Sequence, residues 1–381
     1  MSRESFDLDI RIDPERQRVA KQRAREGRRL MLLELGVAAA LVLGFLASGA
    51  SRRLKAALLG AGLASPWLLV GAYLGLVLVG YALAMAPLGW WSGYVRAHHY
   101  GLSTQTLRLW LADEAKSLAL SLVFGIAAGE VIYWLLRTYP DTWWIWGSTF
   151  LAAASVLLGF VAPVLILPLF NTLTPLDDEE LVARIRRLAE RTGRRVAGVY
   201  TIDLSARTTA ANAMFMGLGR TQRIALGDTL YSQYTPDEIE TIVAHELGHQ
   251  VHHDLYQGLA LQTALLVGAL YLAHLFLRWG VARFGFAGPG DVAALPLVAL
   301  AVGLFSLVTM PLANAHSRWR ERLADRFSLQ ATGNGAALAR AMTRLANQNL
   351  SEIDPPRWAV WLLYSHPPLA ERIALGSEAP A

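Results

Sequence analysis

Six apolar stretches, each about twenty residues long, decide what this chain can fold into. An α-helix of about 20 residues crosses the hydrocarbon core of a bilayer, where only helices and closed barrels satisfy their own backbone hydrogen bonds. Only 17% of the residues are charged, against about 25% in a soluble domain. We therefore predict a mainly α-helical, multi-pass transmembrane bundle with spans at 30–49, 66–91, 117–136, 144–169, 255–277 and 291–313.

The predicted spans divide the 381 residues into five parts. These are a basic N-terminal segment (1–29), four spans with their loops (30–169), a polar stretch (170–254), two further spans (255–313) and a second polar stretch (314–381). The basic segment is interpreted as a helix held near anionic lipid headgroups, because arginine and lysine side chains run through it into the first span. Residues 54–63 are too few to span and are predicted to form an interfacial helix.

The number of spans predicts which parts share a compartment. Four spans separate the N-terminal segment from the first polar stretch, and two more separate that stretch from the second, so all three lie on one side. The loops on the other side contain few lysine and arginine residues, which marks the shared side as cytoplasmic. The net charge of +5 is attributed to this bias and not to nucleic-acid binding. We expect a protein of the bacterial inner (cell) membrane whose partners include the lipid bilayer and no nucleic acid.

The first polar stretch is predicted to form a small α+β domain. Apolar residues at helical spacing indicate a helix at 176–193, and short runs at 196–202, 212–216 and 223–226 indicate strands. A second helix is expected to begin at Thr235, with threonine as the N-cap and proline at the first helical position. The second polar stretch is expected to be largely helical.

The helix that begins at Thr235 carries an H-E-x-x-H pattern, His245-Glu246-Leu247-Gly248-His249. The two imidazoles lie one turn apart on one helix face, with Glu246 beside them. Cysteine is absent, so any metal must be held by histidine and carboxylate. Zinc held in this way lowers the pKa of a water molecule towards ~7. Glu246 can then take the proton of that water and deliver it to a leaving amine.

A third ligand has to come from the same side of the membrane. Glu321 and Asp325 are four residues apart and share a helix face. One can bind the metal while the other accepts the free N–H of a ligating histidine. The alternative is a solvated charged helix in which both acids pair with neighbouring arginines, and the residues by themselves leave both interpretations open.

The motifs resemble those of a known family. His245–His249, followed two spans later by SRWRERLAD at 317–325, is similar to the integral-membrane zinc endopeptidases of the CAAX prenyl protease (type I) family. Residues 98–116, 168–181, 212–230 and 365–373 also resemble that family's stretches, in the same order. The resemblance implies a gluzincin-type zinc metalloprotease domain that binds one Zn²⁺ per chain. It implies His245, His249 and Glu321 as ligands, Glu246 as catalytic base, and Asp325 as the residue that supports a ligand.

Further residues are candidates for contact with the substrate. His366 can stabilise the tetrahedral intermediate, a role that the resemblance favours, or it can cap a helix before Pro367 and Pro368. Arg372 is expected to pair with Asp325 or the substrate, with a plain surface role as the alternative. The segment 212–216 presents an edge that can add a substrate as a strand. Its candidate substrate-binding residues are Asn212, Ala213 and Met214.

Two features differ from the family pattern, and both concern the substrate. The prenyl proteases have seven spans where six are counted here, and their Asn-Ala-aromatic pattern ends in Met214. We predict a zinc-dependent endopeptidase that acts on peptide or protein substrates, membrane-associated or lipidated. The alternatives are a quality-control protease for membrane proteins and a non-catalytic zinc-binding scaffold or transporter.

Overall fold

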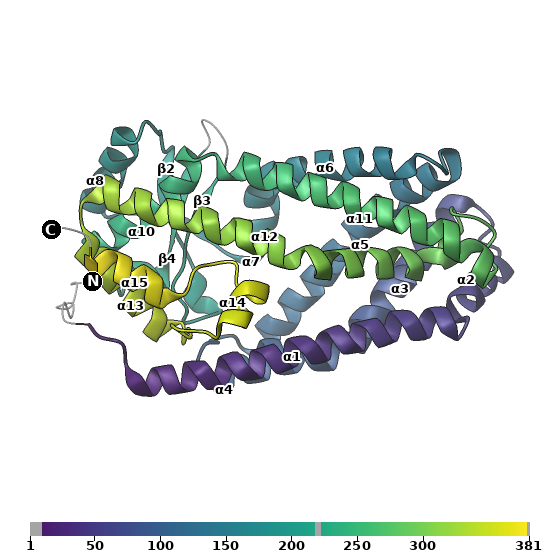
Figure 1. The fold of residues 1–381 in the computed structure, drawn as a ribbon, viewed down its shortest axis with the longest axis horizontal. Coiled ribbons are helices and arrows are strands. Elements are labelled where there is room, and N and C mark those ends of the chain that lie inside the picture. The colour runs from purple at the N-terminus through teal and green to yellow at the C-terminus, as the bar shows by residue number, and fades with distance from the viewer. Residues whose placement is uncertain (1–9, 218–221, 379–381) are drawn as a thin grey trace.

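The predicted spans are helices in the computed structural model, which describes residues 10–217 and 222–378. Within these residues, six helical segments are long and apolar enough to cross a membrane, as predicted. They are elongated and lie side by side, with the polar domain and both chain ends together at one end of the bundle (Figure 1). The long helices are α1 (Pro14–Ala47), α3 (Pro66–Gly89), α5 (Leu107–Thr138), α6 (Trp143–Val161), α11 (Asp254–Phe284) and α12 (Leu295–Thr332).

Shorter helical pieces extend three of these spans. A π-helical turn (Trp90–Val95) and α4 (Arg96–His99) continue α3, while a second π-helical turn (Ala162–Ile166) and α7 (Leu167–Phe170) continue α6. A 3-10 turn, Val292–Ala294, leads into α12. The short helix α2 (Ala50–Gly60) lies where an interfacial helix was predicted, at the end of the bundle away from the polar domain (Figure 1).

Helix α1 contains both the basic segment and the first span. Its first turn is capped by Asp13, whose carboxylate accepts hydrogen bonds from two backbone N–H groups. The basic part lies against the polar domain: the Gln17 side chain donates to the Ser351 carbonyl over 3.0 Å, and Arg28 forms an ion pair of 2.9 Å with Glu352. The N-terminal end of α1 therefore lies beside the second polar stretch, which confirms the predicted parity of the spans.

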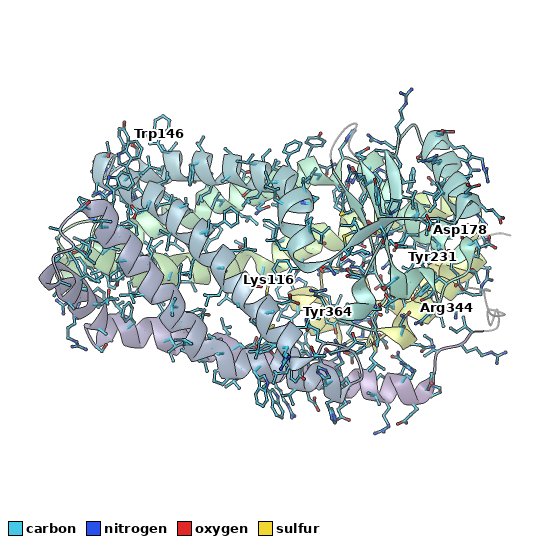
Figure 2. The ribbon with its side chains drawn as sticks, turned by 180° about the vertical axis from the view of Figure 1, so that it is seen from behind. Lys116, Trp146, Asp178, Tyr231, Arg344 and Tyr364 are labelled. Carbon is cyan, nitrogen blue, oxygen red and sulfur yellow. The ribbon has the colours of Figure 1, made fainter. Side chains whose placement is uncertain are left out.

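The core of the bundle lies towards the end away from the polar domain. Fully buried Tyr73, Leu136, Trp143 and Leu277 of this core come from four different helices. Figure 2 shows Trp146 at this end of the bundle, whereas Asp178, Tyr231 and Arg344 belong to the polar domain and Lys116 and Tyr364 lie near the junction of the two. The molecule is thus apolar along the bundle and polar at one end, as a membrane-spanning protein with a domain outside the bilayer requires.

The polar domain contains a four-stranded sheet in the order β1-β2-β4-β3. Strand β2 (Gly198–Ile202) pairs antiparallel with β1 (Leu173–Pro175) and parallel with β4 (Arg223–Gly227), which pairs antiparallel with β3 (Ala213–Met216). Three strands confirm the prediction; β1 was missed because three residues that include a proline carry no alternating pattern. Strand β3 lies at the edge of the described sheet, so its outer backbone groups are free for another strand.

Four longer helices complete the domain around its core. They are α8 (Glu179–Arg191), α10 (Pro236–Val251), α13 (Gly335–Gln348) and α15 (Leu369–Glu378), with the short α9 (Asp228–Tyr231) after β4 and α14 (Arg357–Leu363) beside the bundle. The predicted start of α10 is a capping box, in which Thr235 and Glu238 each accept the other's backbone N–H. Fully buried Leu188, Ile224, Val243 and Leu338 come from α8, the sheet, α10 and α13 and hold these elements together.

Helix α10 approaches α12 closely at Gly248. A Cβ atom at this position would lie 3.0 Å from the Cα of Ala324 and 3.3 Å from its carbonyl oxygen. Backbone atoms cannot move aside as a flexible side chain can, so the two helices depend on glycine here.

We expect Gly248→Ala to push α12 away from α10, because overpacking a core costs about 1–3 kcal/mol. The variant should unfold at a lower temperature in detergent and retain less bound metal. Gly258→Ala in α11 is the matched control, because its Cβ would meet nothing within 4 Å. Unchanged stability and metal content in Gly248→Ala would contradict this close packing.

Candidate metal centre

The two histidines of the H-E-x-x-H pattern face the same point in space. Helix α10 places His245 and His249 one turn apart, with their Nε2 atoms 3.2 Å apart and their rings at 90°. The His245 side chain is buried, with 7% of its surface exposed. Glu246 lines the same cavity as both histidines.

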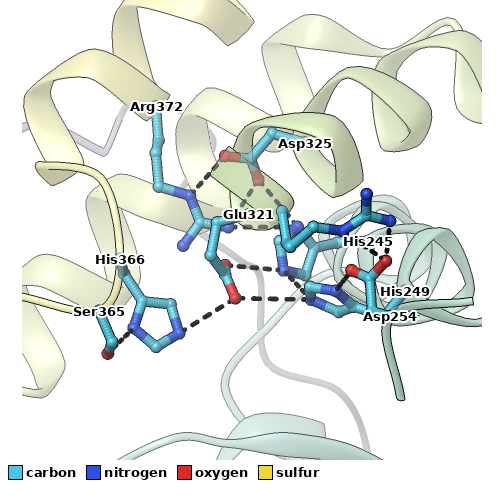
Figure 3. Close-up of polar contacts among 9 residues, drawn as sticks. His245, His249, Asp254, Glu321, Asp325, Ser365, His366 and Arg372 are labelled. Carbon is cyan, nitrogen blue, oxygen red and sulfur yellow. Dashed lines mark hydrogen bonds and ion pairs between the residues drawn. The ribbon is translucent and has the colours of Figure 1, made fainter. Parts of the chain in front are cut away.

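Glu321 on α12 completes the group, as the family resemblance implied. Its carboxylate oxygens lie 3.3 Å from His245 Nε2 and 3.6 Å from His249 Nε2. Figure 3 shows this carboxylate between the two imidazoles and His366. One ligand atom from each of His245, His249 and Glu321 lies within 4.8 Å of the others, and Glu321 Oε2 is buried with no hydrogen-bond partner. An unsatisfied carboxylate oxygen facing two imidazole nitrogens fits a metal ion.

Asp325 holds the His245 ring through Nδ1, the nitrogen that faces away from Glu321. Its Oδ1 lies 2.8 Å from His245 Nδ1, which leaves Nε2 free to face the metal position. Arg372 on α15 donates two hydrogen bonds to the same carboxylate, over 2.9 and 2.6 Å. Of the two partners predicted for Arg372, the structure therefore selects Asp325. Glu321 and Asp325 are buried, with 7% and 1% exposed, which excludes the solvated charged helix.

The arginines next to these acids have other partners. Arg318 donates to the carbonyls of Val360 and Tyr364, and Arg322 pairs with Glu371 over 3.1 Å. Arg320 donates to Asp254. They anchor α12 to its neighbours and leave Glu321 facing the histidines.

Asp254 supports the second histidine, and sequence reasoning missed it. Its Oδ2 lies 2.7 Å from His249 Nδ1, and its Oδ1 accepts from Arg320 Nε over 2.8 Å. In a continuous helix a residue five positions after His249 would be rotated about 140° from it. The chain instead turns at His253, whose φ is 57°, and α11 begins at Asp254. No periodic pattern predicts this turn.

Among the ionisable groups of the centre, His245 and Glu246 have pKa shifts that bear directly on metal binding and proton transfer. Burial lowers the pKa of His245, but the nearby carboxylates of Asp325 and Glu321 outweigh it and raise the pKa to about 9. A metal ion must displace that proton, so metal binding weakens as the pH falls below this value. Burial also raises the pKa of Glu246. A carboxylate with a raised pKa is a better proton acceptor near neutral pH.

His366 joins the centre from the loop before α15. Its Nε2 lies 3.3 Å from Glu321 Oε1, and its Nδ1 lies 2.9 Å from the Ser365 hydroxyl. More than half of its side chain, 59%, is exposed, and it lines the cavity of the centre. It is therefore accessible to a bound molecule.

Part of the strand edge that is predicted to bind substrate lines the same cavity. Asn212 and Ala213 line it together with the metal-site residues, whereas Met214 does not. Phe215 packs against the core of the domain. The cavity has a volume of about 790 Å³, which is enough for several residues of an extended peptide.

Comparisons with known proteins cover nearly the whole chain. Residues 175–378 match Peptidase family M48, and residues 7–172 match the segment described as CAAX prenyl protease N-terminal, five membrane helices. In the described part of that segment, four helices are of spanning length. The eleven-residue α2 is too short to be a fifth.

Individual relatives agree with these matches. The Uncharacterized metalloprotease YhfN of Bacillus subtilis is 34% identical over 76% of this chain and 69% of its own length. CAAX prenyl protease 1 of Saccharomyces cerevisiae is 32% identical over 79% of this chain and 70% of its own length. The crystal structure of S. mikatae Ste24p superimposes with a TM-score of 0.86 and 26% identity, covering 98% of this chain and 92% of that one.

We expect Asp254→Asn to weaken metal binding about 10- to 100-fold, as is typical when the partner of a ligating histidine is changed. The substitution removes the charge that orients His249. Titration of the metal-free protein with zinc against a chromophoric chelator measures the affinity. Glu371→Gln is the control, because Glu371 pairs with Arg322 on the exposed surface. Equal affinities in the two variants would contradict the role of Asp254.

Proposed function

The chain belongs to peptidase family M48 and shares the membrane segment of the CAAX prenyl proteases, and we propose on this premise that it is a zinc-dependent endopeptidase. It hydrolyses peptide bonds in membrane-associated or lipidated substrates. The observation that carries the proposal is the meeting of His245, His249 and Glu321 in one cavity with Glu246.

Zinc suits this donor set. Two imidazole nitrogens and one carboxylate form the set found in many catalytic zinc sites, which keep a further position open. Two nitrogens at 2.0–2.1 Å from a tetrahedral ion lie roughly 3.3 Å apart, and the Nε2 atoms here are 3.2 Å apart. One ion per chain accounts for all three ligands.

Each remaining residue has a role in hydrolysis. When bound, zinc acts as a Lewis acid and lowers the pKa of water. Glu246 accepts a proton from the attacking water and passes it to the leaving amine. His366 donates a hydrogen bond to the oxygen of the scissile carbonyl as negative charge develops on it. Asp325 and Asp254 orient the two imidazoles, and Arg372 holds Asp325 in place.

The substrate adds to the free edge of β3 as a further strand. Asn212 and Ala213, which line the cavity, contact its backbone, and Met214 contacts it from the strand itself. This arrangement presents an extended peptide to Glu246 and the metal. Main-chain hydrogen bonds supply affinity without requiring one sequence.

The membrane position of the centre supports a substrate anchored in the bilayer. Helix α10 is followed directly by the span α11, and α12 carries Glu321 on the same helix that crosses the membrane. Several relatives are named CAAX prenyl protease 1, which motivates a lipidated substrate. We place the centre on the cytoplasmic face of the bacterial inner membrane, because the basic N-terminal segment lies at the same end.

We expect Glu246→Gln to keep about one zinc per chain. Its rate of peptide hydrolysis should fall at least ~10²-fold, because the glutamine side chain cannot accept a proton. Bound zinc is measured by atomic absorption, and cleavage is followed with an unstructured fluorogenic peptide in detergent. Glu240→Gln on the same helix is the control, since Glu240 pairs with Arg184 outside the cavity. Equal cleavage by Glu246→Gln and wild type would contradict Glu246 as the base, and no cleavage by wild type would favour a scaffold or transporter.

We expect Glu321→Ala to lose most of its bound zinc together with activity, because only two neutral imidazoles remain as ligands. The measurement is zinc content after dialysis against a weak chelator. Glu352→Ala is a suitable control: it removes a carboxylate from the same cavity that pairs with Arg28. Full zinc occupancy in Glu321→Ala would show that another residue is the third ligand.

A further inference from the structure

The side chain of Asn349 lies against the edge of the sheet, just before the start of β3. Asn349 is the C-cap of α13. Its side-chain amide accepts a hydrogen bond from the Ala211 backbone N–H over 2.9 Å and donates one to the Ala211 carbonyl over 3.2 Å. Two directly opposed residues of an antiparallel pair exchange the same two hydrogen bonds. The amide therefore takes the place of a strand residue opposite Ala211.

The pairing of the next residue shows which way the backbone of Ala211 points. The Asn212 carbonyl accepts a hydrogen bond from the N–H of Gly227 in β4 over 2.8 Å, so the backbone groups of Asn212 point towards β4. Because this direction alternates along a strand, the N–H and carbonyl groups of Ala211 and Ala213 point to the opposite, outer side. This is the side on which a substrate strand adds to the sheet.

Two consecutive side chains at the end of α13 cover the edge before β3. The Gln348 amide donates to the Thr209 carbonyl over 2.8 Å, two residues before the contact of Asn349 with Ala211. Ala213 is two residues further on, and its outer N–H and carbonyl form no hydrogen bond in the part of the chain that the structure describes. Ala211, Ala213 and Asn349 all line the cavity of the metal centre. The open part of the edge thus begins at Ala213.

The backbone around Asn349 is fixed in an uncommon conformation. Leu350 has a φ of 46°, in the left-handed region that glycine adopts readily and other residues adopt at a cost in free energy. Such conformations persist where the surrounding structure enforces them, and they cluster at functional sites. The N–H of Ser351 donates to the Ala346 carbonyl over 3.0 Å and closes the turn, while the Asn349 carbonyl accepts from Arg23 of α1 over 3.4 Å. The amide is therefore held at the edge from both sides.

We propose that Asn349 determines where a bound peptide leaves the edge of the sheet. The peptide pairs with the outer backbone groups of Ala213, but it cannot pair with Ala211, because the Asn349 amide already occupies that position. Substrate residues beyond this point add no main-chain hydrogen bonds to the edge. This inference rests on the proposed endopeptidase function and on strand addition to β3, and it specifies how long a peptide segment the edge accepts.

Peptides of increasing length test this role in wild type and Asn349→Ala. An unstructured, internally quenched fluorogenic peptide is lengthened by one alanine at a time at each end, until kcat/KM of wild type stops rising. Two further alanines at one of the ends should then raise kcat/KM of Asn349→Ala roughly tenfold through a lower KM, the effect of two additional hydrogen bonds. Wild type should not respond to them. Each ratio of long to short peptide is taken within one protein, so a loss of folded protein does not change it.

Asn347→Ala is the matched control. Asn347 also lies at the end of α13, but its side chain bonds the backbone before α1, at the Asp13 N–H over 3.1 Å and the Arg11 carbonyl over 2.9 Å. This variant should keep the length dependence of wild type. Asn349→Ser, whose hydroxyl can meet only one of the two backbone groups, should shift the length dependence in the same direction by less, and it carries the test if Asn349→Ala does not fold. An unchanged ratio in the Asn349 variants, or an equal loss for every peptide, overturns the proposal.

Failure of the proposed function gives a different result. If wild type cleaves none of the peptides, the endopeptidase proposal fails, and the length dependence is measured as the Kd of the same peptides for Glu246→Gln with and without Asn349→Ala. The same difference is expected there, and an absence of binding overturns strand addition and this inference together. If wild type cleaves the peptides and its KM keeps falling with extension at both ends, the endopeptidase proposal stands and the role of Asn349 fails.

Discussion

The packing of α10 against α12 is the contact on which the metal centre depends. Gly248 and Ala324 allow the two backbones to approach within van der Waals distance, and this brings Glu321 and Asp325 to the histidines of α10. The buried Arg372–Asp325 pair then ties α15 to the same helix. Removing one partner of a buried ion pair leaves an uncompensated charge and costs about 3–5 kcal/mol. The ligands, their supporting carboxylates and the helices that carry them therefore form one cooperative unit.

The membrane bundle and the metal centre are parts of the same helices. Glu321 lies on α12, a single helix from Leu295 to Thr332 whose first half crosses the membrane. At the other ligand helix the chain turns at His253 and continues as the span α11. Helix α1 adds a wall to the cavity from the side of the bundle, through Arg23 and Gly27. The metal-site histidines and Glu321, the start of β3 and this wall from α1 therefore border one cavity at the end of the bundle.

Much of this arrangement was predictable, because it depends on patterns that are local in the sequence. Apolar runs identified the spans, and Thr235 with Pro236 identified the start of α10. The spacing of His245 and His249, and of Glu321 and Asp325, defines one face on each of two helices. Strand β1 is too short for such a pattern. The basic segment is predicted to lie near lipid headgroups, and the structure adds that its described part packs on the polar domain through Gln17 and Arg28.

The sequence by itself determined the six spans, the common side of the three polar parts and the residue types of the centre, because each follows from periodicity, length or span parity. Only the tertiary structure decided which charged groups meet. Asp254 reaches His249 through a turn at His253 that has no periodic signature. Arg372 pairs with Asp325 across 47 residues, and Arg23 reaches the loop after α13 across 326 residues or more. Such pairings depend on how helices pack, and packing joins residues whose separation along the chain carries no information about their distance in space.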